Sequence, residues 1–411
     1  MSDIDLLVKT AVFSPDLNEM KKARVEIREL AASRGAYLAS LHSLYMAIGR
    51  GKVSGFTVPA FNIRTLTYDT ARIVFRLAKE KSIGAFIFEI AKSEMGYTEQ
   101  RPDEYAVAIL AAAVREKYEG PVFVQGDHFQ LSNERYSENP KKEIQSIKDL
   151  IEESISAGFY NIDIDASTLV DLSKSTHSEQ QEDNFQVTAE LSTFIRSKEP
   201  RDITISIGGE IGHIGGTNST TEDFEAFMEG YLPLVGSRPG VSKVSVQTGT
   251  SHGGTVKTDG SLVEVKLDFS VLSSIGDVAR RKYGLGGAVQ HGASTLPNAL
   301  FDEFVKARTL EIHLATGFQN IVFENLPTNL VVEMKEWVNT NAAGERKSDM
   351  SEEQFFYKTR KKALGPFKEK LWSLADRDKK PVLEALQRQF LFLFEVLRTT
   401  NTSGLTKAYD R

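Results

Sequence analysis

The sequence contains no cysteine among its 411 residues. This absence excludes disulfide bonds, thiolate metal ligands and a cysteine nucleophile, and it fits a reducing compartment. Long apolar runs are absent as well, because no window approaches the roughly 18 consecutive apolar residues that cross a bilayer. The N-terminal MSDIDLLVKT lacks the basic region and the apolar core of a signal peptide. We therefore expect a cytoplasmic protein that does not enter a membrane.

Positive charge is not concentrated in any part of the sequence. The 50 lysine and arginine residues are outnumbered by 56 aspartate and glutamate residues, which gives a net charge of −6. Nucleic acids and anionic membranes are therefore not expected partners. Hydrophobic residues make up 41% of the chain and charged residues 26%, as in ordinary soluble globular proteins.

The middle of the sequence alternates short β-rich runs with amphipathic helical segments. The β-rich runs cover residues 55–62, 83–91, 121–128, 160–167, 202–210, 241–250, 285–291 and 310–316. Segments such as TYDTARIVFRLAKEK and EIQSIKDLIEESISAG lie between them and carry apolar residues at helical spacing. Eight such units predict an α/β fold, a (β/α)8 TIM barrel. No glycine-rich dinucleotide-binding motif follows the first run, which disfavours an open doubly wound sheet.

The remaining residues predict helical extensions at both ends of the barrel. We expect an N-terminal helical extension over residues 1–52, the catalytic barrel over 53–328 and a C-terminal helical extension over 329–411. Within the first extension, AYLASLHSLYMAIGRG (36–51) carries helical spacing throughout. The C-terminal segment QRQFLFLFEVL (387–397) is apolar around much of a helix, more than one barrel face would cover. We therefore expect this segment to pack between the subunits of a homo-oligomer.

Polar side chains gather at the ends of the predicted strands, where a (β/α)8 barrel carries its active site. The residues at these ends are Asn62, Glu89, Asp127, His128, Asp165, Ser167, Glu210, His252, His291 and His313. They include four of the seven histidines of the chain. Imidazoles and carboxylates suit zinc, and three protein ligands leave a coordination position for a substrate. The pattern therefore predicts a zinc site.

Each of these residues also has an ordinary structural explanation. A single histidine at a strand end is more often a hydrogen-bonding group than a metal ligand. Asp165 and Glu210 could cap the helices that follow them, and Asn62 forms turns as readily as it binds a substrate. His42 and His177 lie elsewhere in the sequence, and we expect no site role for them. Taken together, the strand-end histidines favour metal binding over these separate explanations.

Two glycine-containing loops indicate an anion site beside the metal. The sequences SHGG (251–254) and HGAS (291–294) place glycine and serine next to a histidine at a strand end. Such loops direct backbone N–H groups at an anion, and the start of the next helix adds partial positive charge. A phosphate beside zinc in one cleft indicates a phosphorylated sugar as the substrate.

These motifs resemble those of the metal-dependent class II fructose- and tagatose-bisphosphate aldolases. The matching sequences are VPAFN, GDH, DAS, GEIGHIGG, GTSHGG and HGAS, in the family's order over residues 53–320. The resemblance implies that Asp127 is the acid–base group at the C4 hydroxyl of the substrate. It also implies that zinc is bound by His128, His252 and His291. The phosphate contacts would be Gly253, Gly292 and Ser294. Asp165 and Glu210 would be positions for a displaced zinc or for a second divalent or a monovalent cation.

The sequence departs from this family in the half of the site that would hold the rest of the substrate. A pair of acids on a mobile loop is replaced by Thr-Asn at 217–218, and Glu222 is the nearest acid that could take their place. His313 stands where the family has an asparagine that steadies the enediolate. Ala315 and Gly317 replace two aspartates. We therefore expect catalytic roles for His313 and Glu222, and an aldehyde product other than glyceraldehyde 3-phosphate.

The sequence thus predicts a zinc-dependent lyase. It would reversibly cleave a phosphorylated ketose, or a close analogue, between C3 and C4 into a dihydroxyacetone-phosphate-like half and an aldehyde. No lysine at a predicted strand end suits a Schiff base, which agrees with a metal route. Asn62 would contact the substrate, and Lys92 and Arg64 offer cations for the aldehyde half.

Two alternatives remain open. GDH followed by AGFYNIDIDAS also resembles the accessory subunits of tagatose-bisphosphate aldolase, which implies a non-catalytic, stabilising partner of an aldolase. The retained histidines disfavour this alternative, because a silent subunit needs no full ligand set. A zinc hydrolase on the same barrel would need paired carboxylates to bridge two metals, and the sequence shows no such pair.

Overall fold

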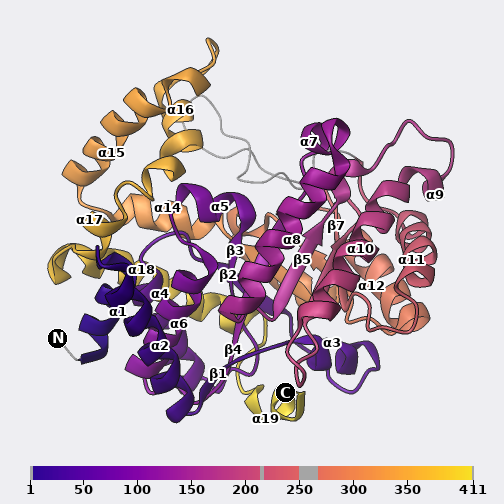
Figure 1. The fold of residues 1–411 in the computed structure, drawn as a ribbon, viewed down its shortest axis with the longest axis horizontal. Coiled ribbons are helices and arrows are strands. Elements are labelled where there is room, and N and C mark those ends of the chain that lie inside the picture. Colours follow the sequence, from indigo (N-terminus) through magenta and orange to yellow (C-terminus); the bar gives the residue numbers. More distant parts are fainter. Residues whose placement is uncertain (1–2, 213–216, 250–266, 410–411) are drawn as a thin grey trace.

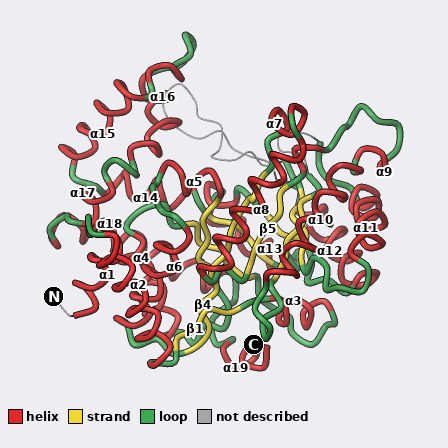
Figure 2. Tube along the Cα trace, viewed as in Figure 1, coloured by secondary structure: helices red, strands yellow, loops and turns green. Residues whose placement is uncertain are grey.

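The computed structural model describes residues 3–212, 217–249 and 267–409. Eight parallel strands close into a barrel, because each strand pairs with the next along the chain and the last pairs with the first. The strands are β2 (Val58–Asn62), β3 (Ile87–Ala91), β4 (Gly120–Gln130), β5 (Asn161–Asp165), β6 (Ser206–Glu210), β7 (Lys243–Val246), β8 (Ala288–Gln290) and β9 (Glu311–Leu314). Figure 2 shows the strands at the centre with helices around them. The predicted (β/α)8 barrel with helical extensions is confirmed.

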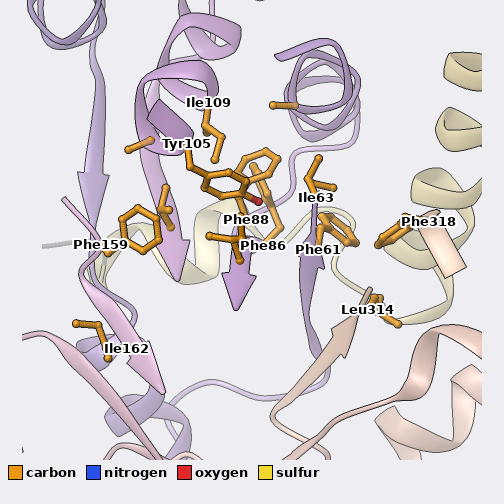
Figure 3. Packing of buried hydrophobic residues seen from close by; sticks show 14 of the residues in the cluster. Phe61, Ile63, Phe86, Phe88, Tyr105, Ile109, Phe159, Ile162, Leu314 and Phe318 are labelled. Atoms are coloured by element: carbon orange, nitrogen blue, oxygen red, sulfur yellow. The ribbon is translucent and has the colours of Figure 1, made fainter. Parts of the chain in front are cut away.

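Helices cover the outer face of this barrel. They include α4 (Thr67–Glu80), α6 (Pro102–Arg115), α8 (Pro140–Ala157), α10 (Glu182–Lys198), α11 (Thr221–Val235), α12 (Phe269–Tyr283), α13 (Phe301–Lys306) and α14 (Thr316–Asn325). Figure 3 shows Phe86, just before β3, and Phe88, within β3, packed beside Tyr105 and Ile109 of α6. Strands buried on both faces are typical of parallel sheets covered by helices.

The N-terminal end of the barrel is closed by α3 (His42–Gly49), which lies below the strands in Figure 1. A separate hydrophobic cluster there joins Leu44 and Tyr45 of α3 with Ala60, Ile87 and Phe123 of the strands. These apolar side chains close this end of the barrel.

One part of the N-terminal extension differs from the helical prediction. The extension forms α1 (Asp3–Phe13), α2 (Leu17–Ser33) and α3, but residues 36–39 form a strand, β1 (Ala36–Ala39). β1 pairs with Gly120–Phe123 at the start of β4. Strand β5 pairs with β4 only from Gln125 onward. The backbone N–H and C=O groups of β4 before Gln125 can therefore pair with β1. Backbone pairing thus overrides the helical spacing of the side chains.

The C-terminal extension runs from the barrel mouth back across its side. It contains α15 (Thr328–Asn341), α16 (Glu352–Thr359), the short helix η5 (Arg360–Ala363), α17 (Lys368–Trp372), α18 (Asp376–Val396) and α19 (Ser403–Thr406). In Figure 1, α15 and α16 stand apart from the barrel. None of the helices in the described ranges is long and apolar enough to cross a membrane. The domain boundaries at residues 52 and 328 stay predictions.

Much of the apolar segment of α18 packs inside the chain, and its expected packing between subunits stays a prediction. The rings of Phe390 and Phe394 lie 4.9 and 5.4 Å from the ring of Phe61 in β2. Phe390 also lies 4.8 Å from Phe318 of α14, and Phe390 and Phe394 are fully buried. The helix is apolar on more than one side because it fills the space between α4 and α14. The homo-oligomer also stays a prediction.

Candidate active site

A β-bulge near the end of β4 brings two neighbouring side chains into one site. The pairing with β5 shifts register between Gly126 and Phe129, so that Asp127 and His128 lie in the irregular part. Successive side chains of a regular strand point to opposite faces, but here both line the same cavity. His128 has a φ of 42°, in the left-handed region that disfavours residues with a side chain. Such strain is held in place where the site requires it.

The described members of the predicted zinc site lie together. The rings of His128 and His291 are 4.2 Å apart. Glu210 and Asp165, at the ends of β6 and β5, lie 3.2 and 2.9 Å from His128 Nδ1. Ligand atoms of His128, Glu210 and His291 all lie within 4.8 Å of one another, as the ligands of one metal ion do. His252, the third predicted zinc ligand, lies outside the described residues.

Burial and opposite charge shift the pKa values of these ligands. Burial lowers the pKa of His128, but the carboxylates of Asp127 and Glu210 raise it well above its ordinary value. Burial and the neighbouring Asp165 raise the pKa of Glu210 to about 7. The carboxylates therefore stabilise positive charge at this point, either as a proton on the histidine or as a metal ion that displaces it. A divalent cation fits this set of donors.

A second polar layer lies deeper in the barrel, and the sequence analysis did not identify it. Lys243, at the start of β7, is fully buried. Its Nζ lies 2.5 Å from Glu311 and 3.0 Å from Asp163, and it donates a hydrogen bond to Gln125. Tyr45 of α3 donates a hydrogen bond to Glu311. The lysine is thus paired with two carboxylates, as a charge in a protein interior has to be.

His313 joins this deeper layer to the cavity. Its Nε2 lies 2.6 Å from Glu311, and its Nδ1 lies 3.2 Å from Asp127 and 3.0 Å from Glu89. The ring also lies 4.1 Å from the ring of His291. Burial lowers the pKa of His313, but Glu89 and Asp127 raise it well above its ordinary value. The carboxylates of Asp127 and Glu311 thus favour the protonated form of His313 at the floor of the cavity.

Strand periodicity carried a signal for the deeper layer. Gln125, Asp163, Lys243 and Glu311 each stand two residues before a polar side chain nearer the strand end. Residues i and i+2 of a strand share a face. Polar residues two positions before another polar residue of the same strand therefore indicate a second polar layer inside the barrel.

A cavity of about 590 Å³ opens above these layers. Asn62, Asp127, His128, His291 and His313 form part of its wall. Asn62 Nδ2 donates a 2.6 Å hydrogen bond to the carboxylate of Glu94, whereas Asn62 Oδ1 has no hydrogen-bond partner among the described residues. The cavity thus joins two histidines of the predicted metal site, the predicted acid–base residue and a side chain that can bind a ligand.

The predicted phosphate contacts lie on the loop after β8, at the wall of this cavity. Gly292 has a φ of 71°, which favours glycine. Ser294 Oγ accepts a 3.0 Å hydrogen bond from the backbone N–H of Gly317. A Cβ on residue 317 would lie 2.3 Å from the Ser294 carbonyl oxygen, so only glycine permits this approach. Gly253 lies outside the described residues.

The two cations that the sequence offered for the aldehyde half line the cavity but are paired with carboxylates. Arg64 lies 2.6 Å from Glu94. Lys92 lies 3.6 Å from Glu143, which also accepts a 2.7 Å hydrogen bond from Arg135. These pairs offset part of the positive charge that Arg64 and Lys92 would present to a ligand.

A further cation comes from the C-terminal extension, which the sequence analysis left without a function. Lys361 of η5 lines the same cavity. Its Nζ lies 5.4 Å from the ring centroid of Tyr97, at the end of α5 (Lys92–Tyr97). Lys361 forms no ion pair with a carboxylate of the described residues. Burial and the nearby Arg64 lower its pKa.

Glu222 is the predicted catalytic residue that lies apart from the others. It is exposed in the first turn of α11. Its carboxylate accepts a 3.0 Å hydrogen bond from Thr221, and it does not contribute to the described wall of the cavity. Its catalytic role stays a prediction.

The comparison with protein families is consistent with this geometry. Residues 44–373 match the family model described as fructose-bisphosphate aldolase class II. This range begins in α3, spans the whole barrel and ends after α17, so it includes η5. No curated protein matches the sequence.

Several solved structures share the fold at low sequence identity. The YdjI aldolase from Escherichia coli K12 has a TM-score of 0.55 and 15% identity, over 89% of this chain and 100% of its own. A fructose-bisphosphate aldolase from Campylobacter jejuni has a TM-score of 0.53 and 15% identity, over 89% and 96%. The fructuronate-tagaturonate epimerase UxaE from Cohnella laeviribosi has a TM-score of 0.56 and 12% identity, over 84% and 82%. At such identities these likenesses concern the fold alone.

Proposed function

Because the chain belongs to the class II fructose-bisphosphate aldolase family, we propose that it is a zinc-dependent aldolase. It cleaves a phosphorylated ketose between C3 and C4 and joins the two halves in the reverse reaction. The observation that carries the proposal is that His128, His291 and Glu210 meet beside Asp127, and that Asp127 and the two histidines line one cavity. These residues would hold zinc together with His252, and Asp165 lies near enough to hold a second cation or a displaced zinc. Zinc in this position supplies a Lewis acid for the ketone oxygen.

Asp127 is the base for the C4 hydroxyl in this proposal. Burial raises the pKa of Asp127, but the nearby imidazoles of His128, His313 and His291 lower it well below its ordinary value. The carboxylate is therefore ionised and able to accept a proton when the ketose is cleaved. In condensation it returns this proton to the new hydroxyl.

The other cavity residues orient the substrate. Gly292 and Ser294 would contact the phosphate of the ketone half, together with Gly253. Asn62 would hold a substrate hydroxyl through its unpartnered Oδ1. His313, 3.2 Å from Asp127, would place its positive charge near the oxygen that gains negative charge during cleavage.

A panel of ketose phosphates tests this function. Release of dihydroxyacetone phosphate is expected from a ketose 1-phosphate, with fructose 1,6-bisphosphate a poor substrate at the same zinc loading. The reason is that Ala315 and Gly317 leave no carboxylate at the end of β9, where the aldehyde half would be anchored. A kcat/KM for the bisphosphate above about 10⁴ M⁻¹s⁻¹ would show that these changes have not altered the specificity.

Lys361 is expected to bind an anionic group at the tail of the aldehyde half. The change Lys361→Met should raise KM about tenfold, equivalent to about 1.4 kcal/mol, for ketose 1-phosphates with a carboxylate or phosphate tail. It should leave KM unchanged for ketose 1-phosphates with a neutral tail. The matched control is Lys362→Met, because Lys362 forms an ion pair with Glu345 away from the cavity. Equal KM values for charged and neutral tails in Lys361→Met would contradict this role.

A further inference from the structure

Glu89 is a buried carboxyl group of the site to which the proposed mechanism gives no function. It lies in β3, has no surface accessible to water and lines the cavity. Its Oε2 accepts a 3.0 Å hydrogen bond from Gln125 Nε2 and lies 3.0 Å from His313 Nδ1. Its Oε1 has no hydrogen-bond partner among the described residues. Both neighbouring donors thus meet one oxygen and leave the other for a proton.

The environment of Glu89 favours the protonated form. Burial raises its pKa to about 7, and the carboxylates of Asp127 and Glu311 add to the rise, while His313 opposes it. A protonated Oε1 is a hydrogen-bond donor, and a buried donor without a partner is destabilising. A ligand in the cavity would supply the partner that the protein does not.

Cleavage between C3 and C4 needs two proton transfers at different atoms. One proton leaves the C4 hydroxyl, and Asp127 accepts it. The electron pair of the broken bond stays with C3, which must gain a proton to complete the ketone half. A second acid is therefore required. Glu89 and Asp127 flank the same nitrogen, His313 Nδ1, at 3.0 and 3.2 Å.

We propose that Glu89 is this second catalytic acid–base group and gives its Oε1 proton to C3 of the ketone half. The inference rests on the proposed aldolase function. The electron pair from the broken C3–C4 bond forms the new C3–H bond, and Glu89 becomes a carboxylate. His313 then gives its Nδ1 proton to Oε2 of Glu89, the oxygen that it faces, and takes the proton of Asp127. Rotation of the Glu89 carboxyl group returns its proton to the side of the cavity, which restores both groups. Condensation runs through the same steps in reverse, and no other reactant is needed.

The change Glu89→Gln tests the proposal, because glutamine keeps the size of the side chain and cannot transfer the proton. In D₂O, the zinc-loaded wild type is expected to exchange deuterium into the C3-derived hydroxymethyl carbon of dihydroxyacetone phosphate. The variant should exchange about a hundredfold more slowly, at the lower end of the effect of a lost general acid. NMR of dihydroxyacetone phosphate alone measures this exchange without the aldehyde half.

A second measurement separates a catalytic role from a structural one. Rapid mixing of Glu89→Gln with the ketose should release aldehyde in a burst of about one equivalent per site, because cleavage then precedes slow protonation. Loss of folding or of metal would produce no burst. The variant Glu89→Asp keeps an acid and should recover part of the exchange, which covers the case in which Glu89→Gln does not fold.

The outcomes distinguish this inference from the proposed function. Exchange by Glu89→Gln at the wild-type rate would overturn the role of Glu89 and leave the aldolase function intact. A zinc-loaded wild type that neither cleaves ketose phosphates nor exchanges deuterium would overturn the aldolase function, and the role of Glu89 with it.

Discussion

Replacement of His291 by alanine is expected to remove the bound metal and to lower the rate of ketose cleavage below detection. His291 is 6% exposed, and its ring lies 4.2 Å from the ring of His128. Ser245 Oγ, 2.9 Å from Nε2, fixes the orientation of the ring. Even the loss of a hydrogen-bond partner of a ligand costs 10–100-fold in metal affinity, so loss of a ligand should exceed about 100-fold.

Metal content of the purified variant, measured by mass spectrometry of its elements, gives the result directly. The control is His177→Ala, since His177 is exposed on α9 (His177–Gln180) and lies 2.7 Å from Asp223 on the surface. This control should retain wild-type metal and activity. Stoichiometric zinc in His291→Ala would show that the ligands lie elsewhere.

Asp127→Asn is expected to lower the cleavage rate by about 10² to 10⁴, the usual effect of removing a general base. Asparagine keeps the size and the hydrogen-bonding oxygen of the side chain, but it cannot accept the C4 hydroxyl proton. Asp127 is not one of the proposed zinc ligands, so metal content should stay near that of the wild type. Stopped-flow measurement of ketose cleavage at saturating substrate reports this step.

The same variant distinguishes proton transfer from substrate binding. If Asp127 acts as the base, kcat should fall while KM stays within about threefold of the wild type. A turnover within tenfold of the wild type would mean that another group accepts the proton. Glu222 is then the next residue to change, although it lies on the exposed turn of α11.

The barrel could be predicted from the sequence because its signals are local. The strands are short β-rich runs, and most of them are followed by a helix with apolar residues at helical spacing. The strand Ala36–Ala39 could not be predicted in this way. Its stability comes from pairing with Gly120–Phe123, more than 80 residues away, and its own side chains carry a helical spacing. The packing of α18 on Phe61 is likewise a tertiary contact.

The polar residues at the strand ends could be predicted to lie together, because all parallel strands of a barrel end on one face. Features of the site that depend on the three-dimensional arrangement of the strands were not predicted. The bulge that turns both Asp127 and His128 into the cavity leaves no mark in a hydrophobicity pattern. Lys243 was overlooked because it stands at the start of a strand, although its charge lies deep in the barrel interior.

A zinc titration tests the central claim most directly. Protein freed of metal by a chelator is titrated with zinc while dihydroxyacetone phosphate release from a ketose 1-phosphate is followed. A metal-dependent aldolase predicts no release without zinc and a linear rise that ends at one equivalent per chain. Turnover that does not depend on a metal would contradict the proposed chemistry. No turnover of any ketose phosphate at full zinc loading would contradict the catalytic function and favour a non-catalytic accessory subunit.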